Sequence, residues 1–382
     1  MSERLIQVCS FRNRIFQLIF SLYHFMSFTV KFPVRSTIMD RPTIADLAEA
    51  AGVSVSTVNR ILSGKGAVKA TTVQRVQGAA EEIGFHGLGA IEDRMRKKVP
   101  HYRLGFLLQQ SSRDLYQLFG RKVVAACRDR REEVIEPLVD FVDLLTPENI
   151  ASRLTALGKE CDAVAIIAAD HPVVGQAIRE LSEQGKPVVT YITDQSAPER
   201  AAFVGTDNWK LGRTAAFLIA GMTQGPGRVA VFNGNHRYQC QDISDAAFRS
   251  YMRENAPELA IEDSRPTNED AARAHEMVCE LLERTDDLSG ILILGGGISG
   301  VLRALRKAPA EARHRIRVVC RDIGPETRKG LTEGLITAAL CHPLDGTSEV
   351  LVRTMVEVLS NRSPAAPVMR IMPFEIITPE NV

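Results

Sequence analysis

The sequence lacks a strong charge of either sign and a cysteine framework. Its 382 residues carry 47 Lys and Arg against 46 Asp and Glu, a formal net charge of +1. A polybasic coat is therefore excluded, and any nucleic-acid site must be a local patch. The 7 cysteines are widely spaced with no CxxC pair, which argues against a structural zinc site and favours reduced thiols over a disulfide framework.

The composition is that of an ordinary globular protein. Hydrophobic residues make up 45% and charged residues 24%, which excludes disorder of the chain as a whole. The length allows two or three domains of common size.

The first 38 residues differ from the rest. Basic residues precede an apolar run from Ile15 to Val30, which suggests a signal peptide or a membrane span. Polar residues interrupt the run, it is shorter than the about 20 apolar residues of a membrane span, and no clean small-residue cleavage site follows. We therefore expect residues 1–38 to be a disordered or non-native extension, with no membrane association.

Residues 39–85 predict three short helices. Thr43 can cap the first helix, and Gly52 can take the positive φ of the tight turn that follows it. Ser54 can cap a second helix over residues 55–62, and a third helix over about 71–82 ends at Gly84.

The first two of these helices have the spacing of a helix-turn-helix unit. Apolar residues of the second helix face inward, which leaves Val55, Ser56, Asn59 and Arg60 exposed. The second helix of such a unit enters the DNA major groove with its N-terminal end, where small and polar side chains reach bases and phosphates. An ordinary small helical bundle is the alternative. The turn followed at once by a Ser- and Thr-rich helix start favours DNA binding.

The segment TIADLAEAAGVSVSTVNRILSGKGAVKATTVQRVQGAAEEIGF resembles the headpiece of LacI-type transcription regulators. The resemblance implies Val55 and Ser56 as base readers, and Arg60 as a contact to a base or the backbone. It implies phosphate contacts from Thr43, Ser54, Thr57, Asn59 and Thr72. Asn59 and Lys69 stand where the family usually has Ser or another small polar residue, so both could alter operator preference.

Residues 86–100 form the expected hinge linker, HGLGAIEDRMRKKVP. In the family this linker folds on DNA and inserts a Leu into the minor groove. Here Arg94 occupies the position of that Leu, and Met95 is the nearest apolar candidate. The basic residues at the end of the segment suit phosphate contact, and a solvated linker remains the alternative.

Residues 101–382 alternate apolar runs with amphipathic stretches, which predicts α/β architecture with parallel sheets and helices on both faces. The expected strands are 103–108, 163–168, 187–192, 202–204, 228–232, 290–294 and 317–320. The expected helices are 118–131, 173–184, 211–220, 246–255, 271–284, 300–307 and 327–333.

Polar side chains recur directly after these strands, at the edge where ligands of such sheets bind. They include Asp170, Asp194, Asp207, Asn208, Arg237 and Asp322. Paired carboxylates and amides suit the vicinal hydroxyls of a sugar. A single Asp at such a position is more often a turn former or a helix cap, so the hypothesis depends on the recurrence.

This half of the chain resembles the periplasmic-binding-protein-like core of the same regulators and of ribose-type sugar-binding proteins. The resemblance implies two lobes, about 101–205 with 342–360 and about 206–341 with 361–382. It implies Asp194 and Asp322 as sugar-contacting acids, Tyr116 as a stacking aromatic and His342 near the position of a ligand-contacting Gln. Ser244 replaces a ligand-binding Arg, which leaves Arg237 or Arg249 as substitutes, and glycines around Gly296 replace an Asn-Asp pair.

Gly295–Gly300 also match the GxGxxG pattern of a dinucleotide loop, with Asp322 at the end of the next strand. This supports an NAD-dependent oxidoreductase as a second hypothesis, but the motif lies late in the chain and no catalytic arrangement accompanies it. An exported sugar-binding protein is a third hypothesis, which the helix-turn-helix argues against.

The sequence therefore predicts an all-α helix-turn-helix headpiece joined to an α/β two-lobed core. We expect a cytoplasmic homodimeric regulator, a repressor rather than an enzyme, that binds a double-stranded DNA operator. Its effector is expected to be a sugar, a polyol or a derivative. No cofactor and no metal site are expected.

Overall fold

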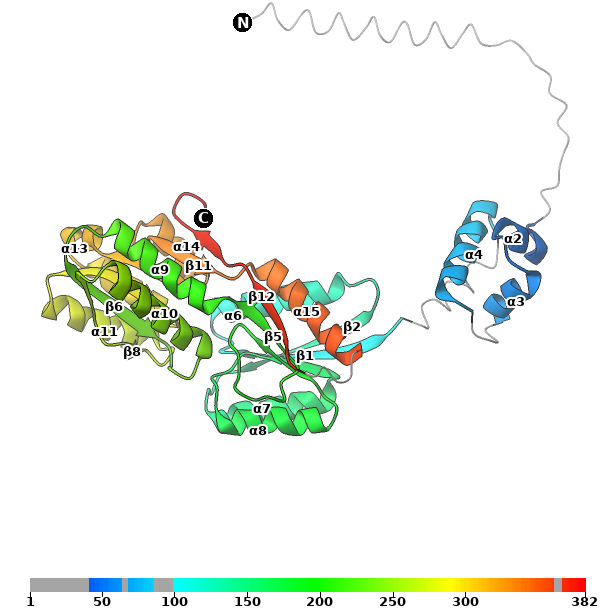
Figure 1. Cartoon of the computed structure of the whole chain (residues 1–382), viewed down its shortest axis with the longest axis horizontal. Coiled ribbons are helices and arrows are strands. Elements are labelled where there is room, and N and C mark those ends of the chain that lie inside the picture. The colour runs from blue at the N-terminus through cyan, green and yellow to red at the C-terminus, as the bar shows by residue number, and fades with distance from the viewer. Residues whose placement is uncertain (1–40, 64–67, 86–88, 90–98, 361–365) are drawn as a thin grey trace, which may run out of the picture. The chain divides into compact units, whose positions relative to one another are not determined.

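The computed structural model describes residues 41–63, 68–85, 89, 99–360 and 366–382. The chain divides into two compact units between Lys98 and Val99 (Figure 1). Among the helices in these ranges, none combines the length and the apolar character that crossing a bilayer requires.

The N-terminal unit consists of α2 (Ile44–Ala50), α3 (Val55–Ser63) and α4 (Ala70–Ile83). Its core is built from side chains at helical spacing on all three helices. The buried members are Leu47, Ala48, Ala51, Val58, Ile61, Val76, Ala79 and Ala80. The three helices predicted from the sequence are confirmed.

Local signals set the ends of these helices. Thr43 and Asp46 form a capping box, in which the backbone N–H of Thr43 donates to Asp46 and that of Asp46 donates to the Thr43 hydroxyl. Gly52, with φ of +60°, makes the turn to α3, and Gly84, with φ of +66°, ends α4.

The second unit contains a first lobe around a six-stranded sheet with the order β12-β5-β4-β3-β1-β2, all parallel. Helices α6 and α15 cover one face, and α7 and α8 cover the other. The strands are β1 (His101–Gln109), β2 (Val134–Val142), β3 (Ala163–Ile166), β4 (Val188–Tyr191), β5 (Ala202–Thr206) and β12 (Val368–Met372). The helices are α6 (Asp114–Arg128), α7 (Pro147–Glu160), α8 (Pro172–Glu183) and α15 (Leu344–Ser360).

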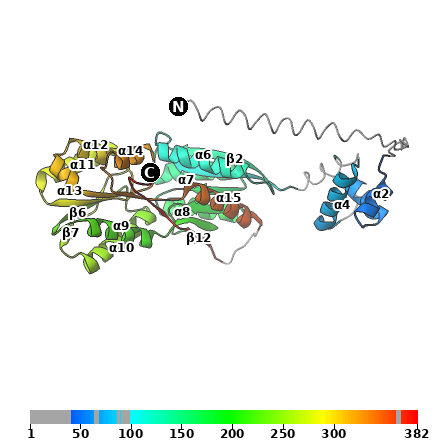
Figure 2. The same cartoon turned by 90° about the horizontal axis from the view of Figure 1, so that it is seen from above.

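The second lobe is built on a seven-stranded sheet with the order β13-β11-β10-β9-β6-β7, to which β8 adds beside β6. Helices α9 and α10 cover one face, and α11 to α14 the other (Figure 2). The strands are β6 (Gly227–Asn233), β7 (Leu259–Ile261), β8 (Arg265–Pro266), β9 (Leu288–Ile293), β10 (Arg317–Arg321), β11 (Ala338–Cys341) and β13 (Glu375–Ile377). The helices are α9 (Asn208–Met222), α10 (Gln239–Asn255), α11 (Ala271–Arg284), α12 (Ile298–Lys307), α13 (Ala310–Arg315) and α14 (Pro325–Thr332).

The C-terminal strands correct two expectations. Residues 368–372 form β12, which pairs with β5 in the first lobe and not in the second, where 361–382 were expected (Figure 1). β13 pairs antiparallel with β11, so the second sheet is mixed rather than parallel throughout. The chain therefore passes between the lobes after β5, after β11 and between β12 and β13.

The sequence prediction also missed several elements. It found most of the central strands, which are largely buried runs, but not the central strand β11. It also missed the strands β2, β7, β8, β12 and β13 and the helices α7, α13 and α15. β2 and β12 are edge strands that are mostly half-exposed or exposed, so they lack the apolar run by which central parallel strands are recognised.

Candidate functional site

The outer face of α3 carries the residues predicted to read DNA. Val55 is 45% exposed although it is apolar, and Ser54, Ser56, Asn59 and Arg60 are also exposed. The opposite face of the same helix buries Val58 and Ile61 in the core. The side chains that the sequence predicted to face outward therefore do so.

A hydroxyl cluster organises the start of α3. The Ser54 hydroxyl lies 2.9 Å from the hydroxyls of both Ser56 and Thr57 and accepts a hydrogen bond from the Thr57 backbone N–H. At this helix N-terminus the cluster can donate to phosphate oxygens.

The remaining DNA-binding candidates surround this face without forming one contact network. Arg60 makes a long 3.4 Å bond from Nε to the Ser56 carbonyl, so most of its guanidinium remains available. Lys69 is exposed before α4 and gives it no side-chain cap, and Thr72 is half-buried in the first turn of α4. Arg94 and Met95 lie outside the described residues.

A cleft separates the two lobes at the carboxyl ends of both sheets. Its inner part has a volume of about 60 Å³ and its outer part about 220 Å³, and both parts are lined by Arg113, Leu115, Ile298, Arg321 and Asp322. Tyr116, Phe119, Ile192, Thr193 and Tyr238 line the inner part. Ligand sites in proteins commonly enclose about 300 Å³ or more, so the inner part alone is too small for a typical ligand.

Asp322 is the best-defined acid of the cleft. Its carboxylate lies 2.5 Å from His342 Nδ1 and accepts the His342 backbone N–H, and it holds a φ of +63° at the end of β10. Burial would raise its pKa, but His342 and the neighbouring Arg321 outweigh burial and keep the pKa of Asp322 below its ordinary value. Asp322 therefore faces the cleft as a carboxylate.

Arg321 lies beside Asp322 with its side chain only 4% exposed. Nη2 lies 3.2 Å from His342 Nε2, while Nε and Nη1 are buried and have no hydrogen-bond partner among the described residues. Nε is 3.8 Å from an Asp322 carboxylate oxygen, too far for a hydrogen bond. Two nitrogens of a buried guanidinium are thus left to donate to a ligand.

One ion pair links the lobes across the cleft. Arg113, between β1 and α6, donates from Nη1 to Glu269 in the β8–α11 loop at 2.7 Å. Gly296 N–H donates to the same carboxylate oxygen at 2.8 Å, and the Gln241 amide donates to the other at 3.2 Å. The Glu269 side chain is only 5% exposed.

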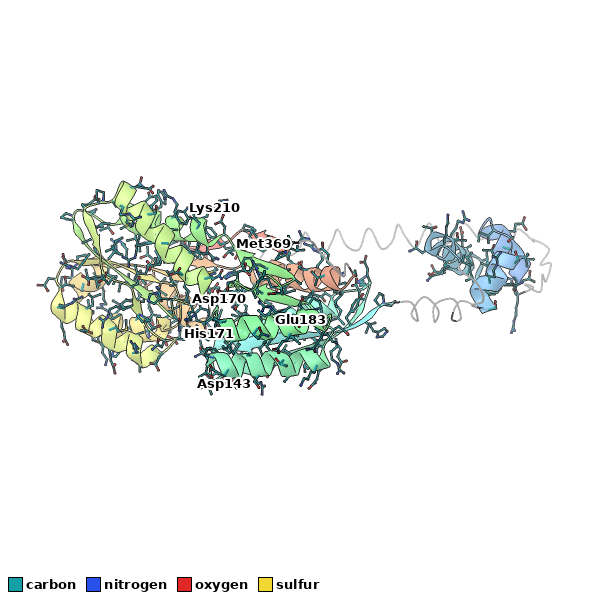
Figure 3. The ribbon with its side chains drawn as sticks, turned by 60° about the horizontal axis from the view of Figure 1, so that its bottom comes forward. Asp143, Asp170, His171, Glu183, Lys210 and Met369 are labelled. Atoms are coloured by element: carbon teal, nitrogen blue, oxygen red, sulfur yellow. The ribbon has the colours of Figure 1, made fainter. Side chains whose placement is uncertain are left out.

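Further contacts hold the lobes together. Asp170 N–H donates to the Arg237 carbonyl at 2.7 Å, and the Gln239 amide donates to the Asp170 carboxylate at 3.0 Å. The Asp170 label in Figure 3 lies where the lobes meet. The hydroxyls of Tyr116 and Tyr238, from opposite lobes, both donate to Gln109 Oε1 at 3.0 Å.

Of the predicted effector contacts, Tyr116, Gly296 and Asp322 line the cleft, and His342 supports Asp322 from behind. Asp170 and Arg237 contact each other at the lobe boundary. Asp194 is held by Arg200 at 2.7 and 2.9 Å, Asp207 caps α9, Asn208 is buried in its first turn, and Arg249 pairs with Asp245. The cavity linings do not include these last four residues.

Sequence reasoning missed Arg113, Gln241, Glu269 and Arg321. Arg321 directly precedes Asp322 at the end of β10, so its position in the sequence could have indicated it. Glu269 reaches the cleft because β8 pairs with β6, which no local pattern indicates.

The glycine loop is explained by packing within the protein. A Cβ on Gly295 would lie 2.3 Å from the Gly234 backbone N, and one on Gly300 would lie 1.9 Å from the Ala271 carbonyl. Close approach of neighbouring backbone thus accounts for these glycines without a dinucleotide.

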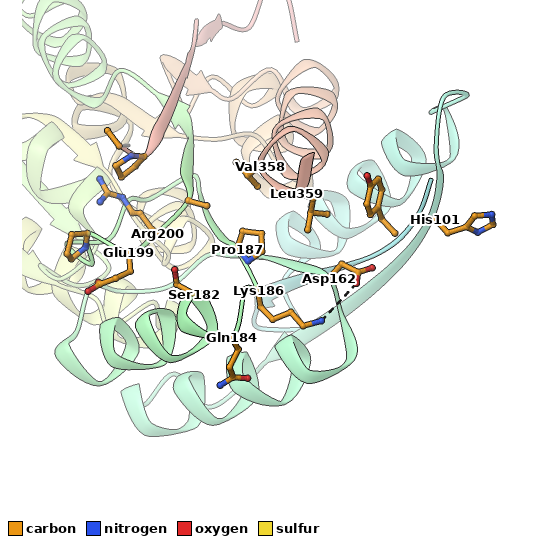
Figure 4. Close-up of a pocket in the computed structure, with 16 residues that line it drawn as sticks. His101, Asp162, Ser182, Gln184, Lys186, Pro187, Glu199, Arg200, Val358 and Leu359 are labelled. Carbon is orange, nitrogen blue, oxygen red and sulfur yellow. Dashed lines mark ion pairs between the residues drawn. The ribbon is translucent and has the colours of Figure 1, made fainter. Parts of the chain in front are cut away.

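A larger cavity of about 790 Å³ lies at the opposite, amino-terminal edge of the first sheet (Figure 4). Its charged side chains are engaged within the protein. Lys186 lies 4.0 Å from Asp162, Glu199 pairs with Arg179, and Arg200 pairs with Asp194. In the described ranges, no three His, Cys, Asp or Glu residues are grouped as a metal site requires.

Comparison with known families identifies the larger unit. Residues 104–363 match the family described as periplasmic binding protein domain. The chain belongs to this family. Residues 43–87 match the lacI family of bacterial regulatory proteins, so the predicted combination of a LacI-type helix-turn-helix with a periplasmic-binding-protein-like core is confirmed.

Different relatives match the N-terminal unit and the two-lobed unit of this chain. The maltose regulon regulatory protein MalI of Escherichia coli (strain K12) is 60% identical over 43 residues, which are 11% of this chain and 13% of MalI. The match therefore spans a small part of that relative's length.

Two solved structures match the two-lobed unit. GanP, a glucose-galactose binding protein from Geobacillus stearothermophilus, has a TM-score of 0.66 at 19% identity, over 74% of this chain and 99% of GanP. A carbohydrate transporter solute binding protein from Agrobacterium radiobacter, in complex with D-arabinose, has a TM-score of 0.67 at 14% identity, over 74% of this chain and 95% of its own. At these identities the likeness establishes the fold.

Proposed function

We propose that the chain is a transcription regulator that binds operator DNA through α3 and a sugar-class effector between its two lobes. We further propose that it acts as a homodimer in the cytoplasm, as a repressor, without catalysing a reaction. Two α3 helices in a dimer would read the two halves of a near-palindromic operator.

One observation carries the proposal. The helix face with exposed Val55, Ser56 and Arg60 belongs to a unit that matches the lacI family, and the same chain continues into the periplasmic binding protein domain. An exposed Val beside Ser and Arg at a helix start suits base contacts in a major groove.

The effector assignment is supported by the cleft. Tyr116 offers an aromatic ring, and Asp322 and Arg321 offer an acceptor and donors at one point of the cleft. The solved relatives named above bind sugars according to their descriptions, which agrees with this chemistry.

Fluorescence anisotropy with a labelled fragment of the upstream region tests DNA binding. We expect tight binding that weakens steeply with salt, and weaker binding to the same bases in scrambled order. Equal affinity for both fragments would contradict a sequence-specific regulator. Adding sugars to the preformed complex then tests whether an effector changes DNA affinity.

A further inference from the structure

We propose that the cleft takes an anionic sugar derivative, a polyhydroxy compound with a carboxylate or phosphate group, and that Glu269 occupies the place of that group until the effector arrives. The inference rests on the proposed effector site and specifies its ligand class. Before the effector binds, the Glu269 carboxylate therefore competes with the acidic group of the effector for the same donors.

The first observation is the set of donors around Glu269. The Arg113 guanidinium, the Gly296 N–H and the Gln241 amide all donate to its carboxylate, at 2.7 to 3.2 Å. Such a set of donors recognises a carboxylate or phosphate oxygen pair.

The second observation is the space that this carboxylate fills. A Cβ on Gly234 would lie 1.5 Å from Glu269 Oε1, and a Cβ on Gly296 would lie 2.3 Å from Oε2. A Cβ on Gly295 would also lie 2.8 Å from Oε1. Three glycines from two loops thus clear a space of carboxylate size inside the cleft.

Arg321 provides an independent pointer to a ligand. It is more than nine-tenths buried and lines both parts of the cleft, and two of its nitrogens, Nε and Nη1, have no hydrogen-bond partner among the described residues. A ligand oxygen pair within the cleft would satisfy both donors, whereas leaving them unpaired is unfavourable.

The charge balance favours an acid over a neutral sugar. The inner part of the cleft contains two guanidinium groups, Arg113 and Arg321, and two carboxylates, Glu269 and Asp322. If a neutral ligand displaced Glu269, Arg113 would remain desolvated without a counter-charge, which is strongly unfavourable. An acidic ligand restores the balance.

The backbone at Glu269 has a conformation that residues with a Cβ adopt rarely. Asn268 and Glu269 have φ of +54° and +60°, a left-handed conformation that is strained for residues with a Cβ. Movement of this loop out of the cleft would make room for a ligand, because the inner part measures only about 60 Å³.

Chemical rescue tests, in the full-length protein, whether the donors around Glu269 bind a free carboxylate. It needs no knowledge of the effector. We expect Glu269→Ala to be stabilised by acetate relative to chloride at equal ionic strength, by about 2–4 °C in Tm, and the wild type to show no such preference. Glu276→Ala, at an exposed position on α11, is the matched control. Identical responses of wild type and Glu269→Ala would overturn the proposal.

Calorimetry with defined probes tests the ligand class. The acids are D-gluconate, D-glucuronate and D-glucose 6-phosphate, which separate carboxylate from phosphate, and the neutral probes are D-glucose and D-sorbitol. We expect an acid to bind, Glu269→Gln to bind it about tenfold more tightly, and Arg321→Gln to bind it at least about tenfold more weakly. Arg273→Gln, exposed on α11, should bind as the wild type does.

The sign of the Glu269→Gln effect separates the two roles of this residue. If Glu269 receives ligand hydroxyls instead of competing with the ligand, the variant binds more weakly. Weaker binding by Glu269→Gln would contradict the proposal. So would binding of the neutral probes alone, or binding of none of the acids. Operator affinity of the same proteins is measured separately, so failure of the regulator proposal would be seen in DNA binding and not in calorimetry.

Discussion

At the scale of single residues, Arg60 gives the most direct test of DNA recognition. Its guanidinium is exposed on α3 and makes only a long bond to its own helix. We expect Arg60→Ala to weaken operator binding by about 1–3 kcal/mol, because a base or phosphate contact is lost while the buried face of α3 stays intact. The measurement is anisotropy with operator and scrambled fragments.

A matched substitution controls for general effects of charge. Glu82→Gln alters an exposed charge near the end of α4 and should leave the ratio of operator to scrambled affinity unchanged. Unchanged operator binding by Arg60→Ala would remove this residue from the proposed interface.

Asp322 links the cleft to the pH dependence of stability. Its native pKa lies below the unfolded value of about 3.9 because the opposing contributions of His342 and Arg321 exceed that of burial. The resulting stabilisation is fully present above the unfolded pKa and is lost as the pH falls through the native pKa. We expect Asp322→Asn to cost about 1–3 kcal/mol at pH 7 and to flatten the stability loss below about pH 4.

Thermal unfolding between pH 3 and pH 7 measures both effects. Asp286→Asn, at an exposed position before β9, should keep the wild-type profile. If Asp322→Asn lost stability below pH 4 as steeply as the wild type does, that would contradict the lowered pKa of Asp322.

At the scale of elements, two glycines of α4 should respond in opposite ways to Ala. Gly84 ends the helix with φ of +66°, so Gly84→Ala should destabilise the N-terminal unit by about 1 kcal/mol. Gly78 is exposed inside α4 with open space around its Cβ position, so Gly78→Ala should stabilise it by about 0.5–1 kcal/mol. Amide hydrogen exchange of α4 in the full chain measures both, and changes of the same sign would contradict the assigned end of the helix.

Local determinants predicted α2 and α3, whereas the edge strand β12 depends on a tertiary neighbour and was missed. Helix α7 was also missed, although Thr146 caps it and Pro147 lies in its first turn. The capping box at Thr43 and the turn at Gly52 depend only on residues close to them in the sequence. Helices α2 and α3 could therefore be predicted from the sequence. β12 depends on its pairing with β5, and its exposed Met369 and Ile371 alternate with half-buried residues.

The residues of the candidate site also differ in how far they could be predicted from the sequence. Asp322 was predictable because parallel strands bring their carboxyl ends to one edge of a sheet. Glu269 was not, because its loop enters the cleft only through the pairing of β8 with β6.

At the scale of the whole molecule, the proposed dimer has a direct test. Sedimentation equilibrium should give about twice the chain mass of 42.1 kDa. An operator cut to a single half-site should bind much more weakly than the complete one, because one of the two α3 helices loses its contacts. A monomer that binds half-sites and full sites equally well would contradict the dimer.

One late segment of the chain supplies a strand to each lobe, and this has a consequence for synthesis on the ribosome. β12 supplies the outermost strand of one sheet and β13 that of the other, and both come from residues 368–377. Neither sheet can be completed until these late residues have left the exit tunnel. Among the described residues, the core of the three-helix unit is formed by side chains from Ile44 to Phe85, so this unit can adopt its fold while most of the chain is still untranslated.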